Sequence, residues 1–213
     1  FAIRKRLLEY DDVMNSQREV IYAKRRQALE GERLKDEIFD YLDEYVDNVL
    51  DKYYDDALID KINEELLQHL LVEIEIDPDT FQQIGRDGLK DRIIESASKF
   101  YSRKEEMLGH ELMARLERYA VLSVIDEKWK EHLREMDDLK EGIGLRAYGQ
   151  KDPLVEYKAE SFRMFVGLLE NLRDDIISFC FKFFPKEPDQ VAEQQRDDPS
   201  RRMRTVKDSA TNM

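Results

Sequence analysis

The beginning of the chain contains a long stretch without any helix-breaking residue. Residues 2–30 hold neither glycine nor proline, and their apolar side chains recur at alternating three- and four-residue steps, which is the period of an amphipathic α-helix. The stripe comprises Ile3, Leu7, Tyr10, Met14, Ile21 and Ala28, with Gln17 and Lys24 at the polar positions within it. A helix of this length measures roughly 40 Å and cannot bury its stripe on itself. We therefore expect it to pack against other long elements.

Helical periodicity continues through the rest of the chain. After Gly31 the pattern resumes from Leu34 to Val49, either as a kinked continuation or as a second helix, and a shorter helix follows between residues 58 and 70. Asp77 and Pro78 form an expected N-cap with proline at the first helical position. A further helix runs up to a break at Gly109. With 39% charged residues and few glycines or prolines, the chain is predicted to be all-α.

Two long helical patterns, before residue 142 and after Asp152, predict an antiparallel hairpin. Gly142-Ile143-Gly144 is expected to end the first helix, which leaves residues 142–152 as the tip. Helix connections in bundles commonly have about 2–8 residues, so this tip is either a working surface or a loop packed on itself. The apolar stripes of the two helices place Trp129, Leu133 and Phe165 in the hairpin core.

The net charge of −13 is concentrated in one segment. Residues 32–79 contain 17 acidic and 4 basic residues, whereas the remainder of the chain is neutral. Such a surface repels phosphate backbones, and no basic stripe with aromatic residues occurs elsewhere. We therefore expect no nucleic-acid partner. The same segment supports an alternative function, a free-standing acidic helical adaptor that binds a basic protein partner.

Catalytic and cofactor motifs are missing or incomplete. The chain has no P-loop, and the run beginning His110-Glu111 has Ala114 where a zinc-binding helix needs its second histidine. No cofactor or metal is therefore expected, and the three histidines are predicted to be surface or capping residues. Asp11 and Asp12 are interpreted as a solvated, salt-bridged pair rather than a catalytic one. Cys180 lies in an apolar run that predicts burial.

No secretion signal or membrane-length apolar run occurs in the sequence, so a cytoplasmic location is expected. Residues 185–213 hold three of the five prolines and no aromatic residue, a composition that predicts a disordered C-terminal linker.

Four stretches, in order, resemble one known family. They are Arg4-Lys-Arg-Leu-Leu-Glu-Tyr-Asp-Asp-Val-Met-Asn-Ser-Gln-Arg18, Tyr101-Ser-Arg-Lys-Glu-Glu106, Ile125-Asp-Glu-Lys-Trp-Lys-Glu-His-Leu133 and Leu145-Arg-Ala-Tyr-Gly-Gln-Lys-Asp-Pro153. They are similar to the C-terminal region of SecA, the ATPase that drives preproteins through the bacterial SecYEG channel. The resemblance covers residues 1 to about 183 and is weakest in the acidic part.

The resemblance implies a domain organisation. Residues 1–48 would be the first part of a helical scaffold, 49–109 a helical wing domain, 110–184 the second part of the scaffold with a two-helix finger, and 185–213 a linker. ATP and Mg²⁺ would bind to nucleotide-binding domains that this chain lacks, so the chain itself would be non-catalytic. The chain would act at the inner face of the plasma membrane as a peripheral component, with SecYEG and preproteins as partners and a homodimer as a further possibility.

The resemblance also assigns roles to individual residues. The finger tip would contact the substrate or the channel, and one face of the first helix would contact the motor domains. The tip residues are Leu145, Arg146, Tyr148 and Lys151, and the motor-contact residues are Arg4, Tyr10, Asp11, Asp12, Asn15 and Arg18. The family usually has Arg-Gly-Tyr-Ala at the tip, whereas this chain has Arg146-Ala147-Tyr148-Gly149. The exchange changes which position can readily adopt a positive φ.

Overall fold

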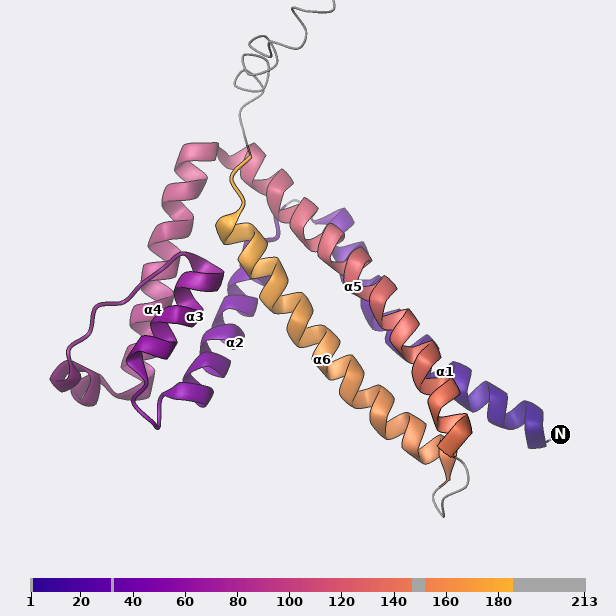
Figure 1. The fold of residues 1–213 in the computed structure, drawn as a ribbon. Helices are drawn as coiled ribbons and strands as arrows, with labels where there is room; N and C mark the ends of the chain where they lie inside the picture. The colour runs from indigo at the N-terminus through magenta and orange to yellow at the C-terminus, as the bar shows by residue number, and fades with distance from the viewer. Residues whose placement is uncertain (1, 32, 147–151, 186–213) are drawn as a thin grey trace, which may run out of the picture. The chain divides into compact units, whose positions relative to one another are not determined.

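A computed structural model describes the backbone of residues 2–31, 33–146 and 152–185, and the side chains of these residues except 2–7 and 144–146. The described residues form six α-helices and no strand, which confirms the all-α prediction (Figure 1). The described residues up to Lys182 form one compact unit, and residues 183–185 lie outside it. The predicted linker lies outside the described residues beyond Pro185. The helices are α1 (Ala2–Glu30), α2 (Lys35–Tyr53), α3 (Ile59–Leu70), α4 (Pro78–Leu108), α5 (His110–Arg146) and α6 (Pro153–Lys182).

Helix α1 is the uninterrupted helix that the sequence predicts, and it packs against both α5 and α6. Ile21 and Ala28 on its apolar stripe are fully buried in the main core. Residues early in α1 contact the end of α5 and the start of α6, as the pairs Asp11–Lys140 and Tyr10–Tyr157 show. Helix α1 therefore runs antiparallel to α5 and parallel to α6.

Helices α5 and α6 form the predicted hairpin and lie side by side (Figure 1). The prediction that Gly142-Ile143-Gly144 ends the first helix is wrong, because α5 continues to Arg146. Ile143 is 3% exposed and packs with Met136 and Tyr157 in a small second core. Burial of a large apolar side chain contributes more than the ~1 kcal/mol that a helical glycine costs. This packing explains why the helix passes through Gly142.

Helices α2, α3 and α4 form a smaller helical layer, here called the α2–α4 subdomain. The inner faces of these helices carry buried apolar side chains, among them Leu42, Leu50, Ile62 and Leu66. Asp77 caps α4 by accepting a hydrogen bond from the Thr80 backbone N–H at 3.0 Å, which confirms the predicted N-cap. Helix α4 is bent at Gly85, whose φ of 67° interrupts the helical backbone.

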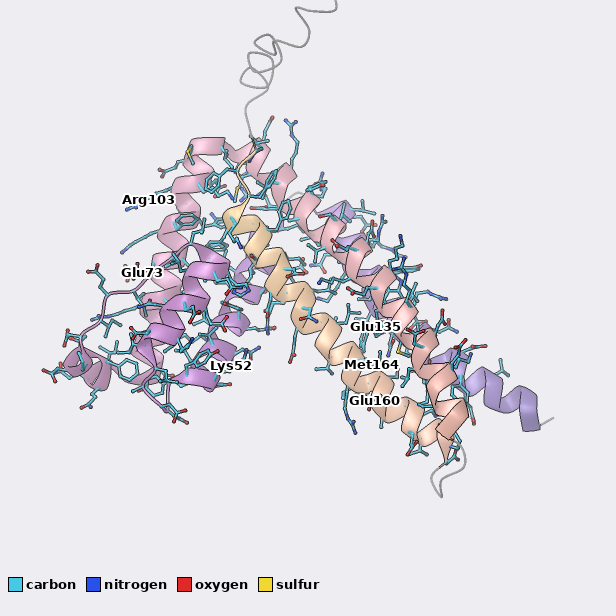
Figure 2. All side chains as sticks on the ribbon, viewed as in Figure 1. Lys52, Glu73, Arg103, Glu135, Glu160 and Met164 are labelled. Carbon is cyan, nitrogen blue, oxygen red and sulfur yellow. The ribbon has the colours of Figure 1, made fainter. Side chains whose placement is uncertain are left out.

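Three aspartates on one face of α2 are paired within the subdomain. The Arg86 guanidinium contacts Asp47 and Asp51, and the Lys90 ammonium contacts Asp43 and Asp47, at distances between 2.6 and 3.2 Å. The hydrogen bonds that Asp47 accepts lower the pKa of its carboxyl group, and the bond from Lys90 has the largest effect. Figure 2 shows further charged side chains, including Lys52 and Glu73, on the outside of this layer.

Gly109 joins α4 to α5 with φ 81° and ψ 152°, a conformation that residues with a Cβ rarely adopt. We predict that Gly109→Ala lowers the free energy of unfolding by about 1–3 kcal/mol. Gly167→Ala is the matched control, because Gly167 lies inside α6 and an added Cβ meets no atom within 4 Å. This control should stabilise the protein by about 0.5–1 kcal/mol. Urea denaturation followed by circular dichroism measures both, and equal effects would contradict the backbone explanation.

Candidate functional site: the polar seam and the junction clamp

A buried polar contact joins α1 to both helices of the hairpin. We call Gln17, His132 and Ser161 the polar seam; their exposed fractions are 6%, 2% and 0%. The Gln17 Nε2 donates to the Ser161 carbonyl oxygen at 3.2 Å and to its Oγ at 2.8 Å, and the Gln17 Oε1 lies 2.9 Å from His132 Nε2. One glutamine side chain therefore contacts α5 and α6 together.

The partners fix the orientation of the Gln17 amide and the tautomer of His132. A backbone carbonyl only accepts hydrogen bonds, so the Gln17 amide nitrogen must face Ser161 and its oxygen must face His132. The His132 Nε2 must consequently carry the hydrogen. The other ring nitrogen, Nδ1, is buried and has no hydrogen-bond partner among the described residues.

Burial lowers the pKa of His132, because a protonated ring would place a second N–H against a site without an acceptor. The prediction that all three histidines are surface or capping residues is therefore wrong for His132. Its ring lies between two aromatic neighbours, 5.5 Å from Trp129 and 5.9 Å from Phe165 between ring centroids. Trp129 is 8% exposed, and Leu133 and Phe165 are partly buried against the main core.

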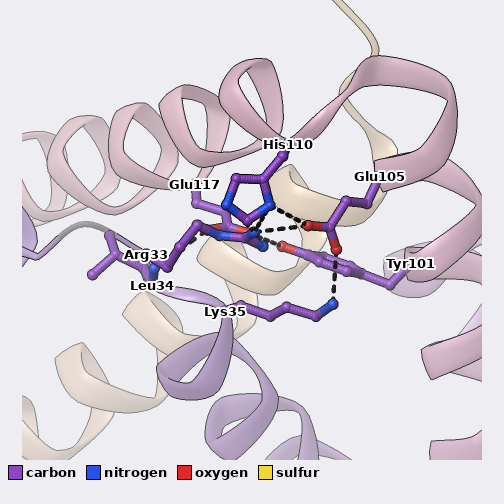
Figure 3. A network of polar contacts seen from close by, with 7 residues as sticks. All are labelled: Arg33, Leu34, Lys35, Tyr101, Glu105, His110 and Glu117. Carbon is purple, nitrogen blue, oxygen red and sulfur yellow. Dashed lines mark hydrogen bonds and ion pairs between the residues drawn. The ribbon is translucent and has the colours of Figure 1, made fainter.

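A second polar group lies where the chain passes between the α2–α4 subdomain and the long helices. We call Arg33, Glu105 and Glu117 the junction clamp (Figure 3). The Arg33 guanidinium binds Glu117 with two nitrogens, at 3.1 and 3.0 Å, and donates from its third nitrogen to Glu105 at 2.7 Å. Burial opposes the charge of Arg33, but hydrogen bonds to Glu117 and Glu105 raise its pKa. The clamp ties the α1–α2 connection to both α4 and α5.

The Glu117 carboxylate is completely buried and is held by several donors. Besides Arg33 it accepts from the Tyr101 hydroxyl at 2.9 Å and from the Leu34 backbone N–H at 3.3 Å. The Glu105 carboxylate accepts from the Lys35 ammonium at 2.7 Å and from Arg33, and these bonds lower its pKa to about 2. His110 contacts Arg33 and Glu105 from the outside (Figure 3).

Lys104 on α4 provides a third long-range polar contact. Its side chain is 2% exposed, and the ammonium donates to the Cys180 and Phe181 carbonyl oxygens at 2.6 and 3.1 Å. These carbonyls belong to the last turn of α6, where helical acceptors lack partners and a cation is favourable. Burial lowers the pKa of Lys104 to about 8. Cys180 itself is fully buried, as its apolar surroundings predict.

The residues proposed from the resemblance as motor contacts lie at the start of α1. Tyr10 packs on Tyr157 with ring centroids 4.7 Å apart and has the Lys140 ammonium 5.7 Å from its ring. The Asp11 carboxylate lies 3.7 Å from the Lys140 ammonium. Asp12, Asn15 and Arg18 are exposed, and Arg18 donates to Asn15 at 3.3 Å. Arg4 lies in α1, with its side chain outside the described residues.

The proposed tip residues lie mostly outside the described part of the chain. Leu145 and Arg146 belong to the last turn of α5, with only their backbone described, and Tyr148 and Lys151 fall in the undescribed segment 147–151. The tip that was predicted as 142–152 therefore begins after Arg146. Within the described ranges, no cluster of His, Cys, Asp and Glu suited to a metal ion is found, and no helix is long and apolar enough to cross a membrane.

Sequence reasoning did not identify the junction clamp. Arg33, Glu105 and Glu117 are separated by up to 84 residues, and each is an ordinary charged residue in its local pattern. Gln17 did give a signal, because it is an uncharged polar residue at a position of the apolar stripe.

A long helix that packs along a helical hairpin, with a subdomain held at their junction by ion pairs to the buried Glu117 and to Glu105, defines an all-α protein with a helical-scaffold architecture. A family model described as the SecA Wing and Scaffold domain matches residues 1–184. The chain belongs to this family.

Similar proteins carry the corresponding name. The chain is 55% identical over 187 residues to "Protein translocase subunit SecA" of Chloroherpeton thalassium, covering 88% of this chain and 18% of the relative. It is 49% identical over 209 residues to "Protein translocase subunit SecA 1" of Chlorobium chlorochromatii, and 51% identical over 209 residues to the SecA subunit of Prosthecochloris aestuarii. The last two matches cover 97% of this chain and 21% and 20% of the relatives. The chain thus spans about a fifth of the length of the curated relatives it matches.

Arg33→Met is expected to lower the free energy of unfolding by about 3–5 kcal/mol, because it leaves the Glu117 charge buried without its ionic partner. The double variant Arg33→Met/Glu117→Gln should recover a large part of this loss, since a neutral amide oxygen still accepts from Tyr101. Urea denaturation of wild type, both single variants and the double variant gives the coupling energy. A double variant no more stable than Arg33→Met alone would contradict this account of the clamp.

The lowered pKa of His132 predicts a pH dependence. In the unfolded chain the ring takes up a proton as the pH falls below about 6.5, whereas the folded protein resists that proton. Stability should therefore fall as the pH drops from 7 to 5.5, with a slope of at most about 1.4 kcal/mol per pH unit from this group. Chemical denaturation at several pH values should show a smaller slope for His132→Gln. An unchanged slope would exclude His132 as its source.

Proposed function

We propose that the chain is the coupling part of a SecA-type protein translocase: it transmits ATP-driven motion of motor domains to a preprotein moving through the SecYEG channel. The membership of the SecA wing and scaffold family, together with relatives named as translocase subunits, supports this proposal. ATP and Mg²⁺ would bind in domains outside this chain. The chain would act on the cytoplasmic side of the membrane as a peripheral component, and a homodimer is compatible with this role.

The observation that carries the proposal is the packing of α1 on both helices of the hairpin. Gln17 contacts His132 on α5 and Ser161 on α6, while Tyr10 and Asp11 contact the far end of the hairpin through Tyr157 and Lys140. A displacement of α1 would therefore act on the hairpin along most of its length. This is the arrangement that a coupling element requires.

The proposal assigns a role to each part of the fold. Residues 1–48 and 110–184 would form the scaffold, residues 49–109 the wing, and residues 185–213 a linker. Motor domains would contact the face of α1 that carries Arg4, Tyr10, Asp11, Asp12, Asn15 and Arg18. The last turn of α5 and the segment that follows it would be the finger tip, where Leu145, Arg146, Tyr148 and Lys151 engage the preprotein or the channel.

The alternative of an acidic adaptor receives less support. Three aspartates of α2, Asp43, Asp47 and Asp51, are already paired with Arg86 and Lys90 of α4. Part of the negative charge of residues 32–79 is thus used within the fold. An adaptor would still bind a basic protein without motor domains, with an affinity that falls steeply as salt rises.

Tyr148→Ala tests the coupling function in a full-length SecA translocase that carries this chain as its wing and scaffold region. We expect preprotein translocation to fall severalfold while basal ATP hydrolysis stays within about twofold, because the tip would contact the preprotein and not the nucleotide. Translocation into SecYEG vesicles and ATP hydrolysis are measured on the same preparation.

Tyr119→Ala is the matched control for the tip variant. Tyr119 is a tyrosine of α5, 61% exposed, in the half of that helix far from Arg146. Its loss should leave translocation unchanged. Unimpaired translocation in Tyr148→Ala, or equal impairment in both variants, would count against the proposed role of the tip.

A further inference from the structure

Apart from the polar seam, the contacts between α1 and the hairpin are of two physical kinds. Apolar side chains such as Ile21 and Ala28 fill the main core, and apolar contact is non-directional. The ion pairs Arg25–Asp126 and Asp11–Lys140 lie at the surface, with all four side chains at least 41% exposed. Long exposed side chains can follow a partner that moves by a few ångströms. Neither of these contacts defines the axial position of α1 sharply. Outside the polar seam, the directional bonds to α5 come from the connection that follows α1, where Arg33 binds Glu117 and the Gly31 carbonyl oxygen accepts from the Arg118 guanidinium.

The polar seam differs from both because its geometry permits one axial position. A shift of α1 by one residue moves Gln17 by 1.5 Å along the axis and turns its side chain by about 100°. A shift by a full turn would bring Met14 or Ile21 opposite His132 and Ser161. Neither of these side chains can accept a hydrogen bond from His132 Nε2 or donate one to Ser161. The buried polar groups would then lack partners, which proteins strongly avoid.

The seam also holds the two hairpin helices to the same reference point. The Gln17 amide nitrogen bonds to Ser161 of α6, and its oxygen bonds to His132 of α5. The His132 ring is in turn held between Trp129 and Phe165, one from each hairpin helix. A displacement of α1 therefore acts through this point on α5 and α6 together.

We propose that Gln17 is a positioning residue that fixes the axial register of α1 against the hairpin, so that α1 and both hairpin helices move as one body. This inference rests on the proposed coupling function for its biological consequence. Its structural part, the fixed register, stands independently of that function. It goes beyond family membership because it assigns transmission of movement to one buried amide and its two partners.

The structural part is tested on the full 213-residue chain by distance measurement between two spin labels. Arg26 on α1 and Lys158 on α6 are exposed and offset along the helix axes, so their separation responds to sliding. Both are changed to Cys in a Cys180→Ala background and labelled. Gln17→Met retains the length and volume of the side chain but removes its hydrogen bonds. Ile21→Met is the control, since it changes a buried residue one turn away without removing a hydrogen bond.

Wild type and Ile21→Met should give one narrow distance distribution. Gln17→Met should give a distribution at least twice as wide or a second population shifted by about 5 Å, the rise of one helical turn. If Gln17→Met does not fold, as judged by circular dichroism, Ser161→Ala replaces it, because it removes only the bond to Oγ and should broaden the distribution less. A narrow, unshifted distribution in the folded variant would overturn the inference.

The functional part is tested by the number of residues translocated per ATP hydrolysed, in the same full-length translocase used for the tip variant. Gln17→Met is expected to lower this ratio at least threefold while preprotein-stimulated hydrolysis stays within twofold, and Ile21→Met should leave the ratio unchanged. A residue that only stabilised the fold would lower both activities together. A proportional loss would therefore refute a role in transmission.

The two proposals fail in different ways. If Tyr148→Ala leaves translocation intact, the coupling function is wrong whatever the distance distributions show. If Tyr148→Ala uncouples the translocase but Gln17→Met changes neither the distance distribution nor the ratio, the coupling function stands and the role of Gln17 is wrong.

Discussion

The ion pair between Arg33 and the buried Glu117 is the interaction on which the arrangement of the helices depends. Glu117 is fully buried on α5, and Arg33 lies in the short connection between α1 and α2. Charges in such a place are tolerated only when their partners are held in good geometry. The two-nitrogen contact from Arg33, the Tyr101 hydroxyl and the Leu34 N–H supply that geometry. The α2–α4 subdomain is consequently attached by directional bonds, and the core alone would define its orientation less precisely.

Local patterns predicted the elements of the fold better than the contacts between them. The uninterrupted helix α1, the N-cap at Asp77 and the hairpin of α5 and α6 each follow from periodicity and capping residues nearby in the sequence. The end of α5 does not follow from such nearby signals, because the burial of Ile143 against Tyr157 prolongs the helix past Gly142. Packing between distant residues decided that boundary, and no local signal reports it.

The candidate site was predictable only where a residue departed from its own pattern. Gln17 stands at a position of an apolar stripe, and this departure is visible in the periodicity of residues 2–30 alone. His132 gave no such signal, since its burial depends on Trp129 and on Phe165 from the other hairpin helix. The clamp residues are charged residues on charged helices, and only the fold reveals that Glu117 is buried. The residues assigned to the tip and the motor contacts came from family resemblance and remain proposals.

The contact of Lys104 with the end of α6 bears on how this fold could be divided. In sequence, α2–α4 stands between α1 and α5 like an insertion, which suggests that the hairpin is a separable module. Yet the ammonium of Lys104 on α4 donates hydrogen bonds to the carbonyl oxygens of Cys180 and Phe181 in the last turn of α6. A shortened chain without α2–α4 would lose that cap and leave these two carbonyl oxygens without the Lys104 ammonium. The apparent insertion is thus part of the hairpin's own architecture, and cutting it out would damage the element that it seems only to interrupt.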